Sequence, residues 1–492
     1  MIPSKRKDKT VLYVPAEKQR YKKNKGNEEY MAYTCCVRGC GARLHLHKNN
    51  QCIVVNNVHS HVFTAEEIVK EHEFMQNLKE ACANLNLPGP LPSVSQLFYA
   101  KAEEANVTNI SFKSVESTCN KARRAALPLS PQSVEQINEL FKIEYIRENF
   151  GMSKRPKEQT SSMFFKRAYE CPEYAYCVFA SDDAINAILE NTDVGTRKIY
   201  VDGTFKICPI GRFSQVLIIF AELLGHVIPF AYITMSHKTE MIYKAVFGYI
   251  HSHVMSLKCQ MFMSDYEKAL RNGFLSIVPN VDARCCWFHY CQATKRNAKK
   301  IPEMMQYIKS DDKAKEIYYH ILSLPLLPAD QISLAFQMIK MRANALNAGI
   351  FKRFLIYWEK QWLQNEGPEK ISVFDLPNRT TGALEAFNGV LGRNIPKRSG
   401  FFRFLHALRF QEQKKAYDVN LIVKSGGGTK KMQSLKSKLR NIQIAEANDA
   451  LKNNEIGVSA FLKRVCFSRY NKQDDFCLAF DHLNDIDEEI DI

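Results

Sequence analysis

The stretch YVDGTFKICP, residues 200–209, places a single aspartate, Asp202, at the end of an apolar segment. Residues 199–201 favour a strand, and a second short strand is predicted over residues 205–207. A carboxylate at the edge of a buried sheet has two ordinary explanations. It is a turn residue, as an aspartate before glycine often is, or it is a ligand for a cation.

The segments that follow alternate strand and helix patterns. Three apolar strand patterns with glycine-containing turns between them predict an antiparallel meander over residues 198–236. A helical pattern follows, then the short strand CQMFMSD, which ends in Asp265, a second helix and a last strand, DARCCWFHY. This order predicts an α/β protein with an RNase H-like core. In such a sheet the first strand lies beside the strand after the first helix, which makes Asp202 and Asp265 neighbours.

A site that holds two divalent ions needs a third carboxylate. Two nearby carboxylates repel each other unless a cation lies between them, and oxygen ligands favour Mg²⁺ or Mn²⁺. Glu385 is the candidate, because it begins an amphipathic helix in RTTGALEAFNGVLGRNI. The alternative is that Asp202 is a turn residue, Asp265 a helix cap and Glu385 a surface residue. The competing acids are Asp183, Glu222, Asp282 and Asp375.

Four segments of this region resemble the catalytic core of Mutator-like element (MULE) transposases: YVDGTFK, FMSDYEKAL, CCWFHYCQA and TTGALEAFNGVLGR. The D-G-T-F box of the family matches at Asp202, and its second aspartate matches at Asp265. The last helix matches with Glu385 as the third carboxylate. The C-x2-H motif of the family matches at Cys286 and His289. The family's Asn pair before the glutamate is replaced here by Thr381 and Gly382.

The resemblance implies a cut-and-paste DDE transposase that acts on double-stranded DNA. Two Mg²⁺ or Mn²⁺ ions held by the three acids would activate water or a DNA 3′-hydroxyl and stabilise the leaving oxygen. Cys286 and His289 are expected in auxiliary roles, structural or DNA-positioning, with Trp287 placed to stack on a base. The alternatives are a domesticated, transposase-derived DNA-binding regulator without transposition activity, and an RNase H-type nuclease without strand transfer.

A cluster of cysteine and histidine near the N-terminus has the composition of a zinc site. Four residues separate Cys35 from Cys40, and His59 and His61 follow about twenty residues later. Two thiolates and two imidazoles complete a tetrahedral zinc site, and a small β-rich segment gains from such a metal. On a strand, the two histidines would face the same side. The alternative is two buried thiols and two surface imidazoles, and Cys36 competes with the first cysteine.

This segment resembles FLYWCH and WRKY-like zinc fingers, in which an aromatic residue precedes the first cysteine and an H-x-H pair closes the motif. The resemblance favours Cys35 over Cys36 and implies Zn²⁺. It also implies that the strand face and its basic residues, among them Arg43, bind DNA. The matching residues are Tyr33, Cys35, Cys40, Ala42, Arg43, His59 and His61.

The next segment contains two helical patterns, VSQLFYAKAEEANV and SFKSVESTCNKARRAAL, with Ser111 as the predicted N-cap of the second. The pair is either a DNA-binding helix-turn-helix or an ordinary helical linker with a solvated basic face. In the first case the second helix presents four basic side chains to nucleic acid: Lys113, Lys121, Arg123 and Arg124.

Composition favours a polyanionic partner. The chain of 492 residues has a formal charge of +16, from 68 Lys and Arg against 52 Asp and Glu. A basic protein of this kind is typical of nucleic-acid binding, although a merely soluble basic protein is the alternative. PSKRKDK has the composition of a nuclear import signal, so a nuclear location is expected. No apolar run predicts a membrane span or a secretory signal, and the 15 cysteines are expected to be reduced or metal-bound.

Seven segments are predicted along the chain, together with assembly of a homo-oligomer, because two element ends must be paired. The segments are a basic flexible arm (1–27), a FLYWCH-like zinc finger (28–64), a helical domain (65–150), the first part of the RNase H-like core (151–295), a helical insertion (296–375), the C-terminal helix of the core (376–415), and a basic segment with an acidic tail (416–492).

Overall fold

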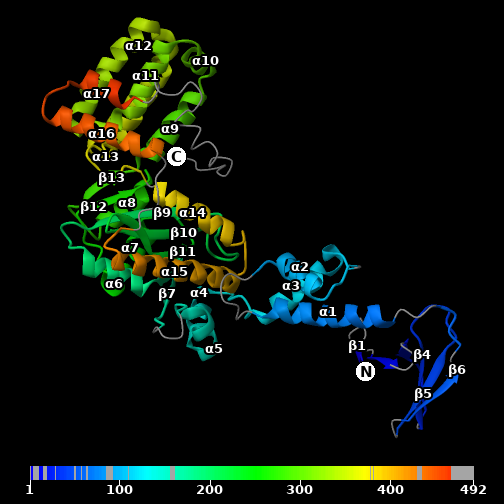
Figure 1. Ribbon diagram of the computed structural model, residues 1–492. Coiled ribbons are helices and arrows are strands. Elements are labelled where there is room, and N and C mark those ends of the chain that lie inside the picture. Colours follow the sequence, from blue (N-terminus) through cyan, green and yellow to red (C-terminus); the bar gives the residue numbers. More distant parts are fainter. Residues whose placement is uncertain are drawn as a thin grey trace. The chain divides into compact units, whose positions relative to one another are not determined.

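The computed structural model forms two compact units, Met1–Pro128 and Leu129–Ile492 (Figure 1). The boundary falls inside the predicted helical domain 65–150, because α4 (Val134–Lys142) packs on β7 of the second unit. No helix in the described part of the chain is both long and apolar enough to cross a bilayer. The structure describes residues 2–3, 10–14, 19–27, 29–48, 51–56, 58–61, 65–84, 92–108, 110–155, 161–376, 378–380, 382–428 and 435–466.

The first unit begins with a six-stranded sheet in the order β1-β2-β3-β4-β5-β6, in which all neighbours are antiparallel. Tyr21, Tyr33 and Leu44 are buried on one face of this sheet. The prediction of a flexible arm over residues 1–27 is therefore wrong for β2 and β3, which belong to the sheet. The strands are β1 (Ile2–Pro3), β2 (Thr10–Val14), β3 (Gln19–Lys23), β4 (Tyr30–Cys35), β5 (Arg43–His47) and β6 (Cys52–Asn56).

Three helices complete the first unit: α1 (Ala65–Ala83), α2 (Val94–Glu104) and α3 (Phe112–Ala126). They share a small core whose members include Phe74, Leu78 and Phe98. The α2 and α3 helices agree with the predicted helical pair. Ser111 is the N-cap residue of α3, as predicted, but its side chain makes no capping hydrogen bond.

The second unit is built on a seven-stranded mixed sheet in the order β13-β12-β9-β10-β11-β8-β7. The antiparallel pairing of β9 with β10 and of β10 with β11 confirms the predicted meander. The parallel pairing of β12 with β9 confirms the predicted neighbours. The strands are β7 (Phe165–Glu170), β8 (Ala175–Ala180), β9 (Lys198–Thr204), β10 (Gln215–Leu223), β11 (His226–Met235), β12 (Met261–Ser264) and β13 (Asp282–Cys285).

Two details of the sheet correct the sequence prediction. Residues 205–207 form a turn after β9, so the second short strand predicted there is absent. The strand predicted over DARCCWFHY ends at Cys285, and Trp287 already begins α9. The strands β7 and β8, which were not predicted from the sequence, extend the sheet beyond the meander.

Helices cover both faces of this sheet. Ile199 and Val201 of β9 face a core shared with α6, α7 and α8, whereas Phe220 of β10 contacts Phe387 of α14 on the other face. Asp202 is one residue beyond Val201, so alternation along the strand turns it towards α14. The helices around the sheet are α5 (Glu144–Ile146), η2 (Arg147–Gly151), α6 (Asp182–Asn191), α7 (Glu240–His253), α8 (Lys268–Leu275), α14 (Gly382–Asn394) and α15 (Phe401–Lys424).

A helical insertion lies between β13 and α14. Its core contains Trp287, Tyr290, Trp358 and Trp362, and it also takes in α16 (Leu435–Lys452) and α17 (Val458–Val465), which lie beside α11 and α12 in Figure 1. Residues 435–466 are thus part of this body rather than a separate basic segment. The predicted acidic tail lies outside the described residues. The other elements are α9 (Trp287–Lys299), α10 (Pro302–Ser310), α11 (Asp312–Ser323), η3 (Leu324–Leu326), α12 (Ala329–Trp358), η4 (Glu359–Glu366) and α13 (Pro368–Ile371).

Candidate metal centres

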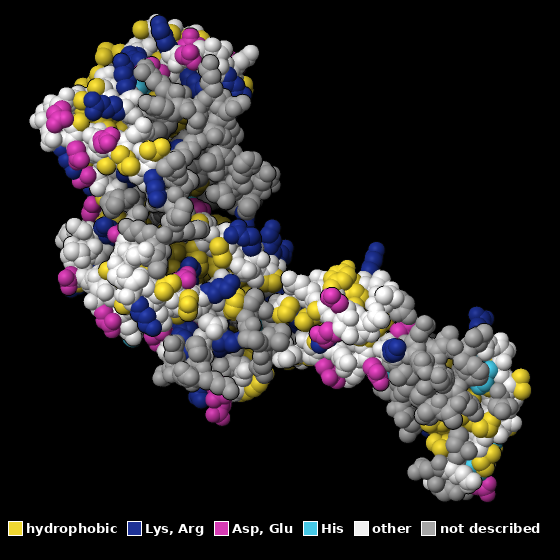
Figure 2. All heavy atoms as spheres, viewed as in Figure 1, with side chains coloured by type: hydrophobic (Ala, Val, Ile, Leu, Met, Phe, Trp, Pro, Cys, Tyr) yellow, Lys and Arg dark blue, Asp and Glu magenta, His cyan; other side chains and the backbone are white. Residues whose placement is uncertain are grey.

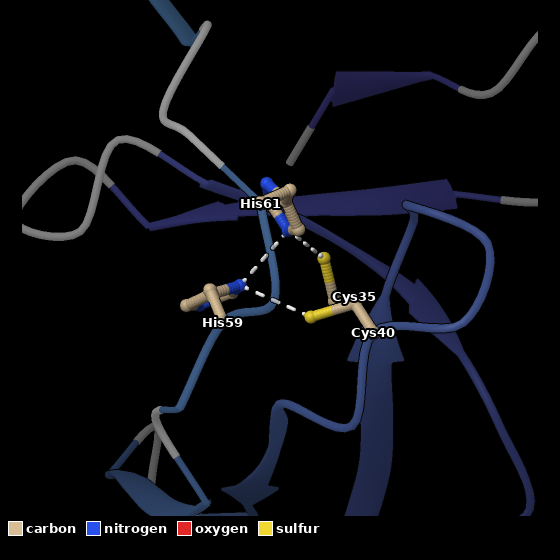
Figure 3. A group of neighbouring side chains, drawn as sticks. All are labelled: Cys35, Cys40, His59 and His61. Atoms are coloured by element: carbon tan, nitrogen blue, oxygen red, sulfur yellow. Dashed lines mark hydrogen bonds between the residues drawn. The ribbon is translucent and has the colours of Figure 1, made fainter.

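In the first unit, Cys35, Cys40, His59 and His61 converge on one point (Figure 3), with one candidate ligand atom from each lying within 4.8 Å of the others. The Sγ atom of Cys35 is 3.3 Å from Nε2 of His61, and Sγ of Cys40 is 3.4 Å from Nδ1 of His59. Two sulfur and two imidazole donors are a set that suits a tetrahedral zinc ion.

The local backbone explains how these four side chains meet. Cys35 ends β4, and Cys40 follows a turn. The two histidines lie in a bend after β6 rather than on a strand, so the strand alternation expected for them does not apply. Cys35, rather than Cys36, belongs to the cluster.

The electrostatics of Cys40 favour metal binding. Burial opposes ionisation of this thiol, but hydrogen bonds from the backbone N–H groups of Ala42 and Ser60 lower its pKa to about 6. Burial raises the pKa of the neighbouring Cys35 thiol. One thiol of the pair is therefore ready to bind a cation as a thiolate at neutral pH, because the thiolate is the form that coordinates metals.

The predicted nucleic-acid-binding residues of the first unit separate into two groups. Arg43, Lys113, Lys121 and Arg124 are exposed. Arg123 is only 3% exposed, and its guanidinium donates hydrogen bonds to the carbonyl oxygens of Cys82 and Pro92. The prediction that Arg123 projects from the helix toward DNA is therefore wrong, since this side chain ties α3 to α1 and to the start of α2.

In the second unit, Asp202, His289 and Glu385 form a second group, again with ligand atoms within 4.8 Å of one another. They come from β9, the first turn of α9 and the first turn of α14. Asp202 is 6% exposed and accepts a 2.6 Å hydrogen bond from the side-chain amide of Asn388. Nε2 of His289 is 3.3 Å from Oε1 of Glu385.

Asp265 lies next to this group without being a member of it. In the parallel ladder Met263 is level with Tyr200, so two residues further Asp265 comes level with Asp202. One of its carboxylate oxygens accepts a hydrogen bond from the backbone N–H of Glu267. The structure therefore brings the two predicted aspartates to the same end of neighbouring strands.

Burial and like charge dominate the electrostatics of Asp202. Burial and then the charge of Glu385 raise the pKa of Asp202 well above its usual range, Asp265 adds to the effect, and His289 opposes it. Burial would lower the pKa of His289, but Cys286 and Glu385 raise it well above the usual value. A site in which carboxylates repel each other in this way is one that a cation stabilises.

Residues 198–293 match the MULE transposase domain. The matched MULE segment runs from the start of β9 into α9 and contains Asp202, Asp265, Cys286 and His289, whereas Glu385 and the Cys–His cluster lie outside it. No curated protein matches the chain. The match supports a transposase-type domain over the part of the sheet that carries the two aspartates.

The four acids that competed with Glu385 in the sequence each pair with other residues, and none belongs to the group around Asp202. This leaves Glu385 as the glutamate that the fold places beside Asp202. The pairs are Asp183 with Arg155, Glu222 with Tyr200 and Asn378, Asp282 with Arg284, and Asp375 with Lys452.

The structure assigns Trp287 and Asn388 roles other than those expected from the sequence. Trp287 is 4% exposed, and its indole N–H donates to the carbonyl oxygen of Leu322, so the prediction that it stacks on a base is wrong. Asn388 was missed, although it stands one helical turn after Glu385 and so shares its helix face. Gly382 begins α14, and Thr381 lies outside the described residues.

Proposed function

We propose that this chain is a DDE-type DNA transposase in which the seven-stranded sheet and its helices are an RNase H-like core. The observation that carries the proposal is that Glu385 lies beside Asp202, while Asp265 follows the neighbouring strand at the level of Asp202. Both aspartates belong to the segment that matches the MULE transposase domain. Its substrates are the terminal repeats of the element and target DNA. The protein works in the nucleus as a homo-oligomer.

The residues present fit divalent ions. Asp202 is buried beside the half-buried Glu385, burial and then the charge of Glu385 raise the pKa of Asp202, and Asp265 adds a third carboxylate nearby. Asp202, Asp265 and Glu385 would hold Mg²⁺ or Mn²⁺, which accept oxygen ligands in octahedral geometry. When bound, such ions lower the pKa of an attacking water or 3′-hydroxyl and stabilise a leaving oxygen.

The chain itself orients these acids. The side-chain amide of Asn388 donates to one carboxylate oxygen of Asp202. The segment that leads into α14 is anchored by Asn378, whose side-chain amide donates to Glu222 at 3.0 Å. These contacts hold Asp202 and the segment that leads to Glu385 before substrate arrives, which is the kind of preorganisation that phosphoryl transfer requires.

Basic side chains at the far end of the helix that carries Glu385 support DNA as the substrate. Arg393, Lys397 and Arg398 are exposed at the end of α14 and just beyond it. Figure 2 shows Lys and Arg side chains gathered over the α14 region of this unit. Cationic side chains beside a phosphoryl-transfer site bind the DNA backbone without reading its sequence.

The Cys–His cluster of the first unit is, in this proposal, a FLYWCH-like zinc finger that contributes to recognition of the terminal repeats. The donor set of two thiols and two imidazoles and the lowered pKa of Cys40 support zinc. Arg43 is exposed on β5 and represents the basic strand face that would contact DNA.

The test is incubation of the full-length protein with end-labelled terminal repeats, a target plasmid and Mg²⁺. Expected products are nicks at the element ends followed by joined DNA. Mn²⁺ is expected to replace Mg²⁺, while Ca²⁺ supports binding with little turnover. Repeat-specific binding with no cleavage in either Mg²⁺ or Mn²⁺ would contradict the enzyme and indicate a DNA-binding regulator. Nicking without joining would indicate a nuclease.

A further inference from the structure

We propose that His289 is a ligand of the ion held by Asp202 and Glu385, so that this centre has a mixed oxygen and nitrogen donor set and prefers Mn²⁺ to Mg²⁺. The inference rests on the proposed function, because the ion concerned is the catalytic one. It adds a ligand and a metal preference to an otherwise all-carboxylate site.

The geometry favours His289 over Asp265 as the third donor. A ligand atom of His289 lies within 4.8 Å of those of both Asp202 and Glu385, whereas Asp265 does not belong to this group. The imidazole also approaches Glu385 directly, at 3.3 Å between Nε2 and Oε1. An ion bound by both carboxylates would therefore lie within reach of the imidazole nitrogen, where it would replace the proton that Cys286 and Glu385 favour on His289 in the metal-free site.

The backbone around His289 holds it at this position. The N–H of Cys286 donates to the carbonyl oxygen of Ser264, the last residue of β12, at 2.9 Å. The N–H of Trp287 donates to the carbonyl oxygen of Arg379, in the segment that leads to α14, at 3.2 Å. The start of α9 is thus tied to both neighbours of the site.

The chemistry of the donor set predicts the metal preference. Mg²⁺ prefers oxygen ligands and keeps several waters, so an imidazole adds little to its binding. Imidazole strengthens the binding of first-row transition metals, and Mn²⁺ is the one among them that also suits carboxylate and water. The competing explanation is that His289 only positions Glu385 through a hydrogen bond and never touches the ion.

The experiment is pulsed electron paramagnetic resonance of Mn²⁺ bound to the full-length, zinc-loaded protein without DNA. A directly coordinated imidazole gives nitrogen coupling to the manganese, and ¹⁵N-labelling of histidine shifts that coupling without any substitution. Mn²⁺ stands at the weak end of the affinity order and does not displace zinc from thiolates, so His59 and His61 do not contribute.

The expected result is nitrogen coupling in the wild type that is lost in His289→Gln, with Mn²⁺ affinity lowered at least about tenfold. Mg²⁺ affinity should change much less. His253→Gln, an exposed histidine on α7, is the matched control and should retain both properties. Absence of coupling in the wild type, or its persistence in His289→Gln, overturns the inference.

Failure of this inference is distinguishable from failure of the proposed function. Asp265→Asn should keep the nitrogen coupling, because Asp265 is not among the three clustered donors, and yet lose DNA cleavage. If nitrogen coupling is absent but cleavage depends on the three acids, the proposed transposase function stands and His289 is not a metal ligand. If nitrogen coupling is present but the protein cleaves no terminal repeat, the metal site with His289 stands and the proposed transposase function is rejected.

Discussion

The Cys–His centre of the first unit and the Asp–His–Glu centre of the second draw their ligands from very different lengths of chain. All four residues of the first lie between Cys35 and His61, around two strands and a bend. The second joins Asp202 to Glu385 across a sheet, an insertion and two helices. A local centre is therefore part of the folding of its segment, whereas a distant one is assembled by a fold that is stable without it.

The largest expected effect is loss of the first centre. Cys40→Ser should release the zinc and unfold the six-stranded sheet beside it, since a structural zinc site contributes about 10–16 kcal/mol in small fingers. Metal analysis and limited proteolysis check this, and the second unit should keep its melting temperature. Zinc-free wild-type protein with an intact, protease-resistant sheet would break the comparison.

A smaller effect is expected from Asn388, which serves the second centre without being a proposed ligand. Asn388→Ala removes the hydrogen bond to Asp202 and should lower the rate of cleavage about 10–100-fold, as loss of a ligand's supporting contact commonly does. Folding should be unaffected. Asn394→Ala is the control on the same helix, since the side-chain amide of Asn394 donates to the backbone carbonyl oxygen of Val390. Equal rates in the two variants would show that Asn388 does not orient Asp202.

The smallest effect is on stability in the absence of metal. Asp202→Asn replaces a buried carboxyl group whose ionisation is opposed by its burial and by the charge of the half-buried Glu385, so in EDTA it should stabilise the second unit by about 1 kcal/mol or leave it unchanged. Thermal unfolding measures this. The change in stability is expected to have opposite signs in the two centres, because loss of a ligand unfolds the first and leaves the second folded. A clear drop in the melting temperature of metal-free Asp202→Asn would contradict it.

The strands of the sheet could be predicted from the sequence where neighbouring residues determine the element. The apolar patterns around Asp202 and Asp265 predicted the meander and the parallel neighbour of β9, because each strand is bounded by turn residues. The strands β7 and β8 were not predicted, and α16 and α17 were not placed in the insertion. Those assignments depend on packing partners distant in the chain.

Individual side chains were less predictable than elements. Arg123 continues the spacing of the buried residues Val115 and Cys119 along α3, so the helical period placed it on the inner face despite its charge. Trp287 belongs to the core of the insertion because α9 begins one residue after Cys286. In both cases the residue type suggested DNA contact, and the position in the helix decided otherwise.

The most direct test of the central claim compares Asp202→Asn with Asp183→Asn in cleavage of labelled terminal repeats under Mg²⁺. Both substitutions remove one carboxylate charge at the same side-chain size, but Asp183 pairs with Arg155 away from the site. Asp202→Asn should bind DNA normally and produce neither nicks nor joined products, as should Asp265→Asn and Glu385→Gln, while Asp183→Asn remains active. Cleavage by Asp202→Asn at the wild-type rate would contradict the account, and full activity of Glu385→Gln alone would show that another residue is the third acid.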